Sequence, residues 1–177
     1  STPYVVQFFP IYACNFTCKY CHHSIPRQER KFVTDWPIMK YELFEKCIGE
    51  LAQFPEKIKT LRFVGMGEPL LHMDIVRMGG RAKQADVANT IEIITNGSLL
   101  THSVSDGLIE AGLDRLVISL QGTSAEKYHD ICGVALDFEE FVGNIRYFYE
   151  HKKHTQMYLK IVDIALDDEA DKQRYFD

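Results

Sequence analysis

Five short runs of β-branched and aromatic residues alternate along this chain with stretches of helical periodicity. The runs lie at 4–9, 60–64, 90–95, 115–120 and 157–162. Alternation of this kind predicts βαβ units, in which the strands form a parallel sheet and each crossover is right-handed. We therefore expect an α/β fold. In such folds, ligands bind beyond the carboxyl ends of the strands.

The clearest helical pattern is an apolar stripe at i, i+3, i+4 and i+7, formed by Phe44, Cys47, Ile48 and Leu51. Further helices are expected at 74–85, at 103–111, at 138–149 and from 167 onward. Gly79 and Gly80 weaken the first of these, because glycine costs helix stability. The stripe at 138–149 is interpreted as core.

Chain length, net charge and the distribution of apolar residues restrict the kind of protein that this chain can form. The chain has 177 residues and a net charge of −5, which fits one globular domain and argues against a nucleic-acid partner. The sequence contains no apolar run near the roughly 20 residues of a membrane span. The first residues do not resemble a signal peptide. We expect a cytoplasmic protein without a membrane partner.

Three cysteines, Cys14, Cys18 and Cys21, directly follow the first predicted strand. They are too close together for a disulfide framework, so a metal site in a reducing compartment is the better interpretation. Three thiolates can hold an iron–sulfur cluster and leave one iron open to a small molecule. Structural zinc is the alternative. It normally needs four ligands, and here only His22 or His23 stands near enough in sequence to complete the set.

Other unusual segments also follow predicted strands. Gly65-Met66-Gly67-Glu68-Pro69 follows the second, Thr95-Asn96-Gly97 closes the third, and residues 119–122 end the fourth. Because the carboxyl ends of parallel strands meet at one edge of the sheet, these segments and the cysteines should form one shared site.

The cysteine spacing CxxxCxxC, with the aromatic Tyr20 just before the last cysteine, is similar to the signature of the radical S-adenosylmethionine (SAM) superfamily. The loop at 65–69 resembles that family's Gly-Gly-Glu loop, with Met66 in place of the second glycine. The segment 94–97 resembles its third strand ending, and Ser119 matches a fourth-strand position often used for SAM. The resemblance covers nearly the whole chain.

The resemblance implies a partial TIM-type barrel of parallel (β/α) units, with five strands visible of a six-unit radical SAM barrel. Residues 1–177 would then be a radical SAM core domain that is truncated at its C-terminal end. The run from Gln121 to Asn144 resembles the branch that carries a cysteine-rich SPASM-type extension.

The resemblance also implies the cofactors. Cys14, Cys18 and Cys21 would hold a [4Fe–4S] cluster, and SAM would bind its open iron. A one-electron reductant such as flavodoxin or ferredoxin would then allow cleavage to a 5′-deoxyadenosyl radical. That radical would abstract hydrogen from a peptide or a small molecule such as a sugar. The alternatives are a radical SAM RNA methyltransferase and a non-catalytic metal-binding module.

The expected SAM contacts lie at the four motifs and on the fifth strand; they are Tyr20, Gly65, Gly67, Glu68, Thr95, Asn96, Ser119 and Lys160. The glycines would allow close backbone approach to the ligand. Glu68 is otherwise a solvated loop charge, and Thr95 with Asn96 otherwise forms a simple turn. Lys160 either faces solvent or meets the SAM carboxylate.

Some polar residues and thiols fall outside this set. Cys47 lies on a helical apolar stripe and is expected to be a core thiol. A packing role is favoured for Cys132 as well. His22 and His23 either contact substrate or belong to a solvated loop, and Gln121 is a further candidate for the cofactor or substrate. No catalytic side chain is expected beyond the cluster.

Overall fold

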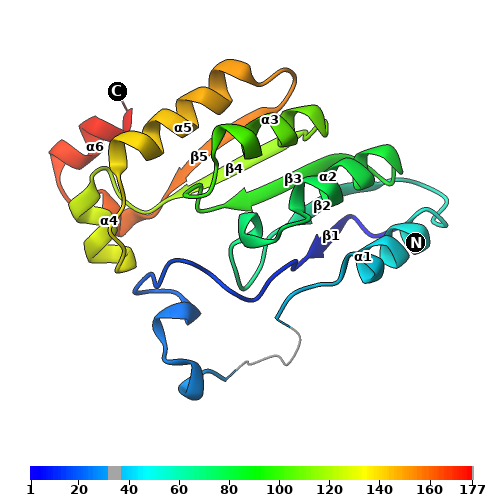
Figure 1. The fold of residues 1–177 in the computed structure, drawn as a ribbon, viewed down its shortest axis with the longest axis horizontal. Coiled ribbons are helices and arrows are strands. Elements are labelled where there is room, and N and C mark those ends of the chain that lie inside the picture. Colours follow the sequence, from blue (N-terminus) through cyan, green and yellow to red (C-terminus); the bar gives the residue numbers. More distant parts are fainter. Residues whose placement is uncertain (32–36, 177) are drawn as a thin grey trace.

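The computed structural model describes residues 1–31 and 37–176 (Figure 1). Its centre is a five-stranded sheet in the order β1-β2-β3-β4-β5, and all neighbouring strands are parallel. The strands are β1 (Val5–Phe8), β2 (Ile58–Phe63), β3 (Ala88–Thr95), β4 (Arg115–Leu120) and β5 (Gln156–Ile161). The predicted α/β architecture, a partial barrel of parallel units, is thereby confirmed.

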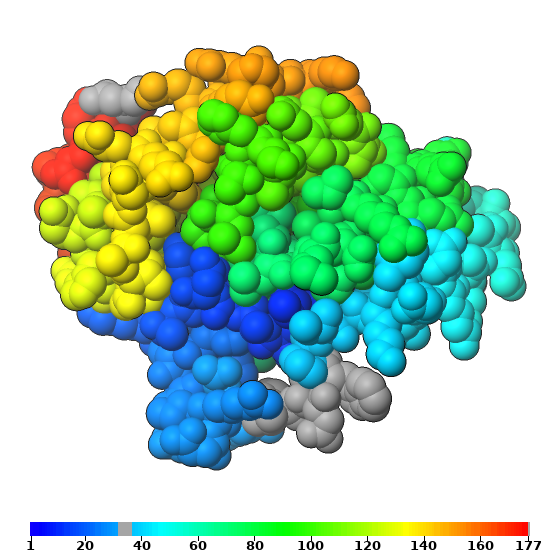
Figure 2. Space-filling model, in the orientation of Figure 1, coloured from blue at the N-terminus to red at the C-terminus, as the bar shows by residue number. Residues whose placement is uncertain are grey.

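Helices cover one face of the sheet (Figure 1). They are α1 (Tyr41–Leu51), α2 (Ile75–Gln84), α3 (His102–Glu110), α4 (Ala125–Cys132), α5 (Phe138–His151) and α6 (Glu169–Phe176). Short 3₁₀ turns add η1 (His22–Ser24), η2 (Arg27–Glu29), η3 (Pro69–Leu71) and η4 (Asp163–Ala165). Figure 2 shows the segment with η1 and η2 projecting from the body of the molecule. No helix within the described ranges is long and apolar enough to cross a bilayer.

The core lies between the sheet and these helices. Alternate residues of the three central strands are buried and apolar: Leu61, Phe63, Ile91, Ile93, Leu116 and Ile118. Successive side chains of a strand point to opposite faces, so the residues between them line the other face of the sheet. The helices α1 to α5 bury apolar side chains in this core, whereas the buried residue of α6 is Asp171.

The helix α2 runs unbroken through Gly79 and Gly80, although these residues lower its intrinsic helix propensity. A Cβ atom at Gly80 would lie 3.5 Å from Cβ of Ala111, just beyond α3. That distance is an ordinary contact, so packing does not require glycine there. Burial of Ile75, Met78 and Ala82 offsets the propensity cost.

The helix α4 was not expected from the sequence. Its start is nevertheless capped by the Ser124 hydroxyl, which accepts a hydrogen bond from the Lys127 amide. Its end is closed by Gly133, whose φ of 67° lies in the left-handed region. Two sequence signals, a serine cap and a terminal glycine, were thus available for this helix.

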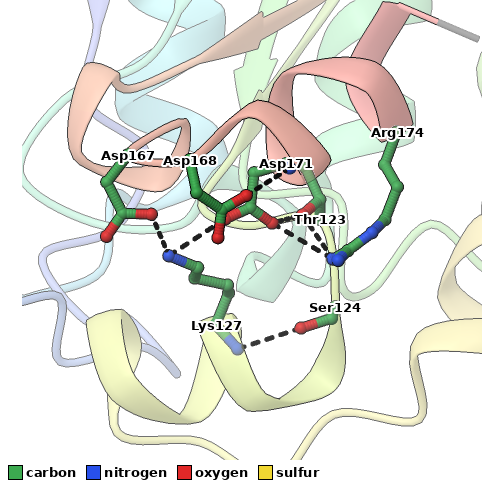
Figure 3. Close-up of polar contacts among 7 residues, drawn as sticks. All are labelled: Thr123, Ser124, Lys127, Asp167, Asp168, Asp171 and Arg174. Atoms are coloured by element: carbon green, nitrogen blue, oxygen red, sulfur yellow. Dashed lines mark hydrogen bonds and ion pairs between the residues drawn. The ribbon is translucent and has the colours of Figure 1, made fainter.

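A cluster of charges fastens α6 to α4 (Figure 3). The buried Asp171 accepts a hydrogen bond from Thr123 and pairs with Arg174 at 3.1 Å and with Lys127 at 3.1 Å. Lys127 also pairs with Asp167. Three aspartates, Asp167, Asp168 and Asp171, are close enough together to hold a metal ion. Two of them already pair with the Lys127 ammonium, so a side-chain cation already compensates the charge of this cluster.

A polar row crosses the sheet on the face opposite the core. The residues in mutual register are Gln7, Arg62, Glu92, Arg115 and Gln156, one from each strand. Glu92 is buried and pairs with Arg62 on one side and with Arg115, at 3.0 Å, on the other. The row therefore ties the three central strands together through side chains as well as through the backbone.

Candidate active site

A cavity of about 280 Å³ opens at the carboxyl ends of the strands. It is lined by the cysteine segment (residues 9–21, between β1 and η1), by the loop after β2 and by the ends of β3, β4 and β5. All eleven sequence-predicted site residues line it: Cys14, Cys18, Tyr20, Cys21, Gly65, Gly67, Glu68, Thr95, Asn96, Ser119 and Lys160. The residues that were expected to share one site therefore line one cavity.

The cysteine segment is held in place by the C-terminal end of α4. The Thr17 amide and hydroxyl both donate to the Cys132 carbonyl, at 3.0 and 2.9 Å, and the Lys19 amide donates to the Ile131 carbonyl at 2.9 Å. Phe16 is buried, with its ring centroid 6.0 Å from that of Tyr128. The end of a helix thus supplies acceptors to a loop that has no secondary structure of its own.

The three thiols are free, and Cys18 is the most buried of them. Burial raises the pKa of Cys14 to about 11, and the nearby Glu68, Cys18 and Cys21 add to this effect. A hydrogen bond with Cys132 lowers the pKa of Cys18. Mutual repulsion of this kind disfavours three bare thiolates, whereas a bound metal deprotonates coordinating thiols. The donor set therefore fits a cationic, thiolate-binding group such as an iron–sulfur cluster.

The loop after β2 packs directly on the cysteine segment. Gly65 has a φ of 132°, and a Cβ there would lie 1.7 Å from the Phe9 ring. A Cβ at Gly67 would lie 2.2 Å from the Ile11 carbonyl oxygen and 2.6 Å from that of Ala13. We expected these glycines to admit a ligand, but contacts within the protein already account for both.

Glu68 is buried at the junction of this loop with β3. Its carboxylate accepts hydrogen bonds from the Leu70 amide at 2.9 Å, from the Thr95 hydroxyl at 2.6 Å and from the Asn96 amide at 2.7 Å. Burial raises its pKa, while these donors act in the opposite direction. The interpretation of Glu68 as a solvated loop charge is therefore wrong.

Thr95 and Asn96 are both engaged within the turn that they form. The Thr95 hydroxyl also accepts from the Gly97 amide at 2.9 Å, and the Asn96 side-chain oxygen accepts from the Ser98 amide at 2.9 Å. The Asn96 amide group donates to Asn15 at 3.0 Å and lies 3.9 Å from the Cys14 sulfur. From the sequence, a simple turn and a cavity-facing strand end were alternatives for these two residues. In the structure, the turn that they form is itself part of the cavity wall.

Ser119 and Lys160 are the unpaired polar side chains of the cavity wall. They stand opposite each other on β4 and β5. Within the described part of the chain, neither the Ser119 hydroxyl nor the Lys160 ammonium forms a hydrogen bond or ion pair. Both groups are therefore available to a ligand.

Tyr20 links the cysteine segment to the end of β4. Its hydroxyl donates to the side-chain oxygen of Gln121, and the side-chain amide of Gln121 donates to the Ser119 carbonyl at 2.8 Å. Burial raises the pKa of Tyr20, which keeps the hydroxyl protonated as a donor. Gln121, the further candidate for contact with the cofactor or substrate, also lines the cavity.

Two histidines and two further cysteines fell outside the predicted set of site residues, and the structure shows where they lie. His23 is buried, with its Nε2 2.6 Å from the Met66 carbonyl oxygen, and neither His23 nor His22 lines the cavity. The structure thus gives no support to a fourth zinc ligand from this pair. Cys47 is half-buried against the core, as expected of a packing thiol. Cys132 is fully buried, with its sulfur 3.4 Å from that of Cys18, a proximity that the sequence did not reveal.

Comparison with known proteins agrees with this geometry. The sequence profile of the Radical SAM superfamily matches residues 8–171. The GTP 3′,8-cyclase of Lactiplantibacillus plantarum is 35% identical over 118 residues, which cover 67% of this chain and 33% of that protein. The probable GTP 3′,8-cyclase of Pyrococcus horikoshii is 32% identical over 148 residues, covering 84% of this chain and 42% of that protein. The chain therefore spans about a third to two fifths of the length of these relatives.

Solved structures share the fold. BtrN in complex with AdoMet and 2-DOIA aligns with a TM-score of 0.66 at 19% identity, over 94% of this chain and 59% of that one. Streptococcus suis SuiB bound to the precursor peptide SuiA aligns with a TM-score of 0.65 at 20% identity, over 91% and 33%. At such identities these likenesses show the architecture alone. The profile match over most of the chain is what shows the family: this chain belongs to the radical SAM superfamily, whose enzymes use a [4Fe–4S] cluster and SAM.

Proposed function

We propose that the cavity binds a [4Fe–4S] cluster on Cys14, Cys18 and Cys21, with SAM beside it, in the core domain of a longer radical SAM enzyme. The observation that carries this proposal is the convergence of three free thiols with unpaired polar side chains in one cavity. When bound, the cluster and SAM supply a 5′-deoxyadenosyl radical that abstracts a substrate hydrogen atom.

The residues of the chain hold and orient these groups. The Lys160 ammonium fits the SAM carboxylate, since a carboxylate and an ammonium form a charge-assisted hydrogen bond. The Ser119 hydroxyl fits a ribose or carboxylate oxygen. Asn96 positions the Cys14 side of the site, while Glu68 keeps the ends of β2 and β3 together.

The substrate is a peptide or a small molecule such as a sugar. The names of the curated relatives favour a small molecule, because GTP 3′,8-cyclase acts on a nucleotide that contains a sugar. An RNA substrate is disfavoured by the net charge of −5. A one-electron donor of the flavodoxin or ferredoxin type serves as the reductant. Anaerobic incubation with SAM, reductant and GTP tests the small-molecule assignment through substrate-dependent formation of 5′-deoxyadenosine.

The cluster is tested by metal content. Protein purified without oxygen should contain about four iron and four sulfide per chain, as one cubane requires. Replacement of Cys14, Cys18 or Cys21 by Ala should abolish cluster assembly, whereas the matched change Cys47→Ala should leave it intact. Stoichiometric zinc without acid-labile sulfide would contradict the proposal and favour a structural metal module.

A further inference from the structure

Cys132 is the one cysteine near the site that the proposed function does not use. It is the last residue of α4 and is fully buried. Its sulfur lies 3.4 Å from the sulfur of Cys18. Cys18 lines the cavity and Cys132 does not, so Cys132 contacts Cys18 from within the protein. That placement is unsuited to a fourth ligand and suited to a neighbour of a ligand.

The backbone fixes this contact on both sides of Cys18. The Cys132 carbonyl accepts the two hydrogen bonds from Thr17, and the Ile131 carbonyl accepts the amide of Lys19. The chain then turns away at Gly133, where a Cβ would lie 2.8 Å from the Thr17 hydroxyl. These bonds fix the backbones on either side of the contact, and both side chains are buried, so the two sulfurs should stay neighbours when Cys18 binds a metal.

The direction of the hydrogen bond follows from the chemistry of ligation. A cysteine that binds iron does so as a thiolate and has no S–H group. In the loaded protein, Cys132 is therefore the only possible donor of the pair. Hydrogen bonds to cluster sulfurs are among the determinants of the reduction potential. Reduction adds a negative charge, which a donor stabilises, so the bond should raise the potential.

We propose that Cys132 is a positioning residue whose thiol donates a hydrogen bond to the cluster-ligating sulfur of Cys18 and raises the reduction potential of the cluster. The inference rests on the proposed cluster site. It assigns to the end of α4 a part in setting how readily the cluster accepts an electron.

The test compares Cys132→Val, Cys132→Ala and Cys132→Ser in the full-length protein, loaded without oxygen. Valine fills the space without a donor, alanine leaves a small cavity, and serine restores a donor. The measurement is the midpoint potential from a redox titration followed by electron paramagnetic resonance. We expect more negative potentials for the valine and alanine variants and a smaller shift for serine. Cys47→Val should leave the potential unchanged.

Equal midpoint potentials in all loaded variants would overturn the proposal. Loss of the cluster in the valine and alanine variants with retention in serine would support a polar contact to Cys18. Loss in all three would overturn the proposal as well, because Cys132 would then be needed for assembly and not for tuning. Absence of a cluster from the unsubstituted protein would instead refute the proposed cluster site, which separates the two failures.

Discussion

Glu68 joins two strand ends through a single buried carboxylate. Its three donors come from η3, from the side chain of Thr95 and from the backbone of Asn96. The three hydrogen bonds favour the ionised form of the Glu68 carboxyl group, whereas burial of that group favours the protonated form. Burial is the larger effect.

Because the pKa of Glu68 is raised above its ordinary value of 4.5, the folded protein retains a proton that the unfolded chain releases above that pH. The free energy of unfolding should therefore fall as pH rises from about 4.5 through the raised pKa. Glu68→Gln should remove this component. Urea unfolding of the cluster-free protein at several pH values measures it. The exposed Glu56→Gln is the control, and identical pH profiles for wild type and Glu68→Gln would contradict the assignment.

The Lys160 ammonium faces the cavity without a hydrogen-bond or ion-pair partner among the described residues. Lys160→Met should weaken SAM binding by about tenfold or more, because a hydrogen bond to a charged group contributes roughly 1.5–3 kcal/mol. Iron content should be unchanged. Equilibrium binding of SAM to the loaded protein gives the measurement, and Lys153→Met, a change at a lysine outside the cavity, is the control. Unaltered SAM affinity would show that Lys160 serves the solvent-facing role that the sequence left open.

Among the elements, α4 connects the cysteine segment to the rest of the fold. The last carbonyls of the helix bind Thr17 and Lys19, and Gly133 lets the chain leave the helix beside Thr17. The length and capping of this helix therefore determine where the cysteine segment lies.

Gly133→Ala should lower the free energy of unfolding by about 1–2 kcal/mol, because a residue with a Cβ is strained in the left-handed region. It should also reduce iron retention, since the new methyl group meets Thr17. Gly143→Ala is the matched change. Gly143 lies within α5 with open space around its Cβ position, so alanine there should stabilise by about 0.5–1 kcal/mol. Chemical denaturation and iron analysis of both variants check the contrast.

The strands and the composition of the cavity were predictable, because apolar runs mark buried parallel strands and their carboxyl ends must meet. The helix α4 was not predicted, because its apolar residues are few and its strength lies in its caps. The roles of Gly67 and Cys132 were not predictable either. Each depends on contact with the cysteine segment across a wide separation in sequence, which no local pattern records.

At the scale of the whole molecule, the polar row on the face opposite the core places one residue of every strand in the same register. Its centre is the buried Glu92 between Arg62 and Arg115. A carboxylate with two guanidinium partners holds the row together, and its removal would leave two cations facing each other without an anion.

Glu92→Gln should therefore lower the free energy of unfolding by about 3 kcal/mol, near the lower end expected for breaking a buried ion pair. The control is Asp86→Asn, which breaks the exposed pair with Lys57 and keeps a residue that tolerates the left-handed φ of 55°. That change should cost about 1 kcal/mol or less. Urea denaturation of the two variants measures the difference, and similar losses would show that the row contributes little.

The anchoring of the cysteine segment on α4 also bears on how the protein is made. Thr17 and its acceptor on Cys132 are 115 positions apart, so the cysteines leave the ribosome long before the helix that fixes them. The nascent cysteine segment must remain without its backbone partners on α4 until β4 and α4 have been synthesised and have docked. A cluster delivered before that point would reach a cysteine segment whose backbone is not yet fixed by α4. A cluster delivered afterwards would reach cysteines that are already positioned. Cluster insertion should accordingly be a late step in biogenesis, following completion of the β4–α4 unit.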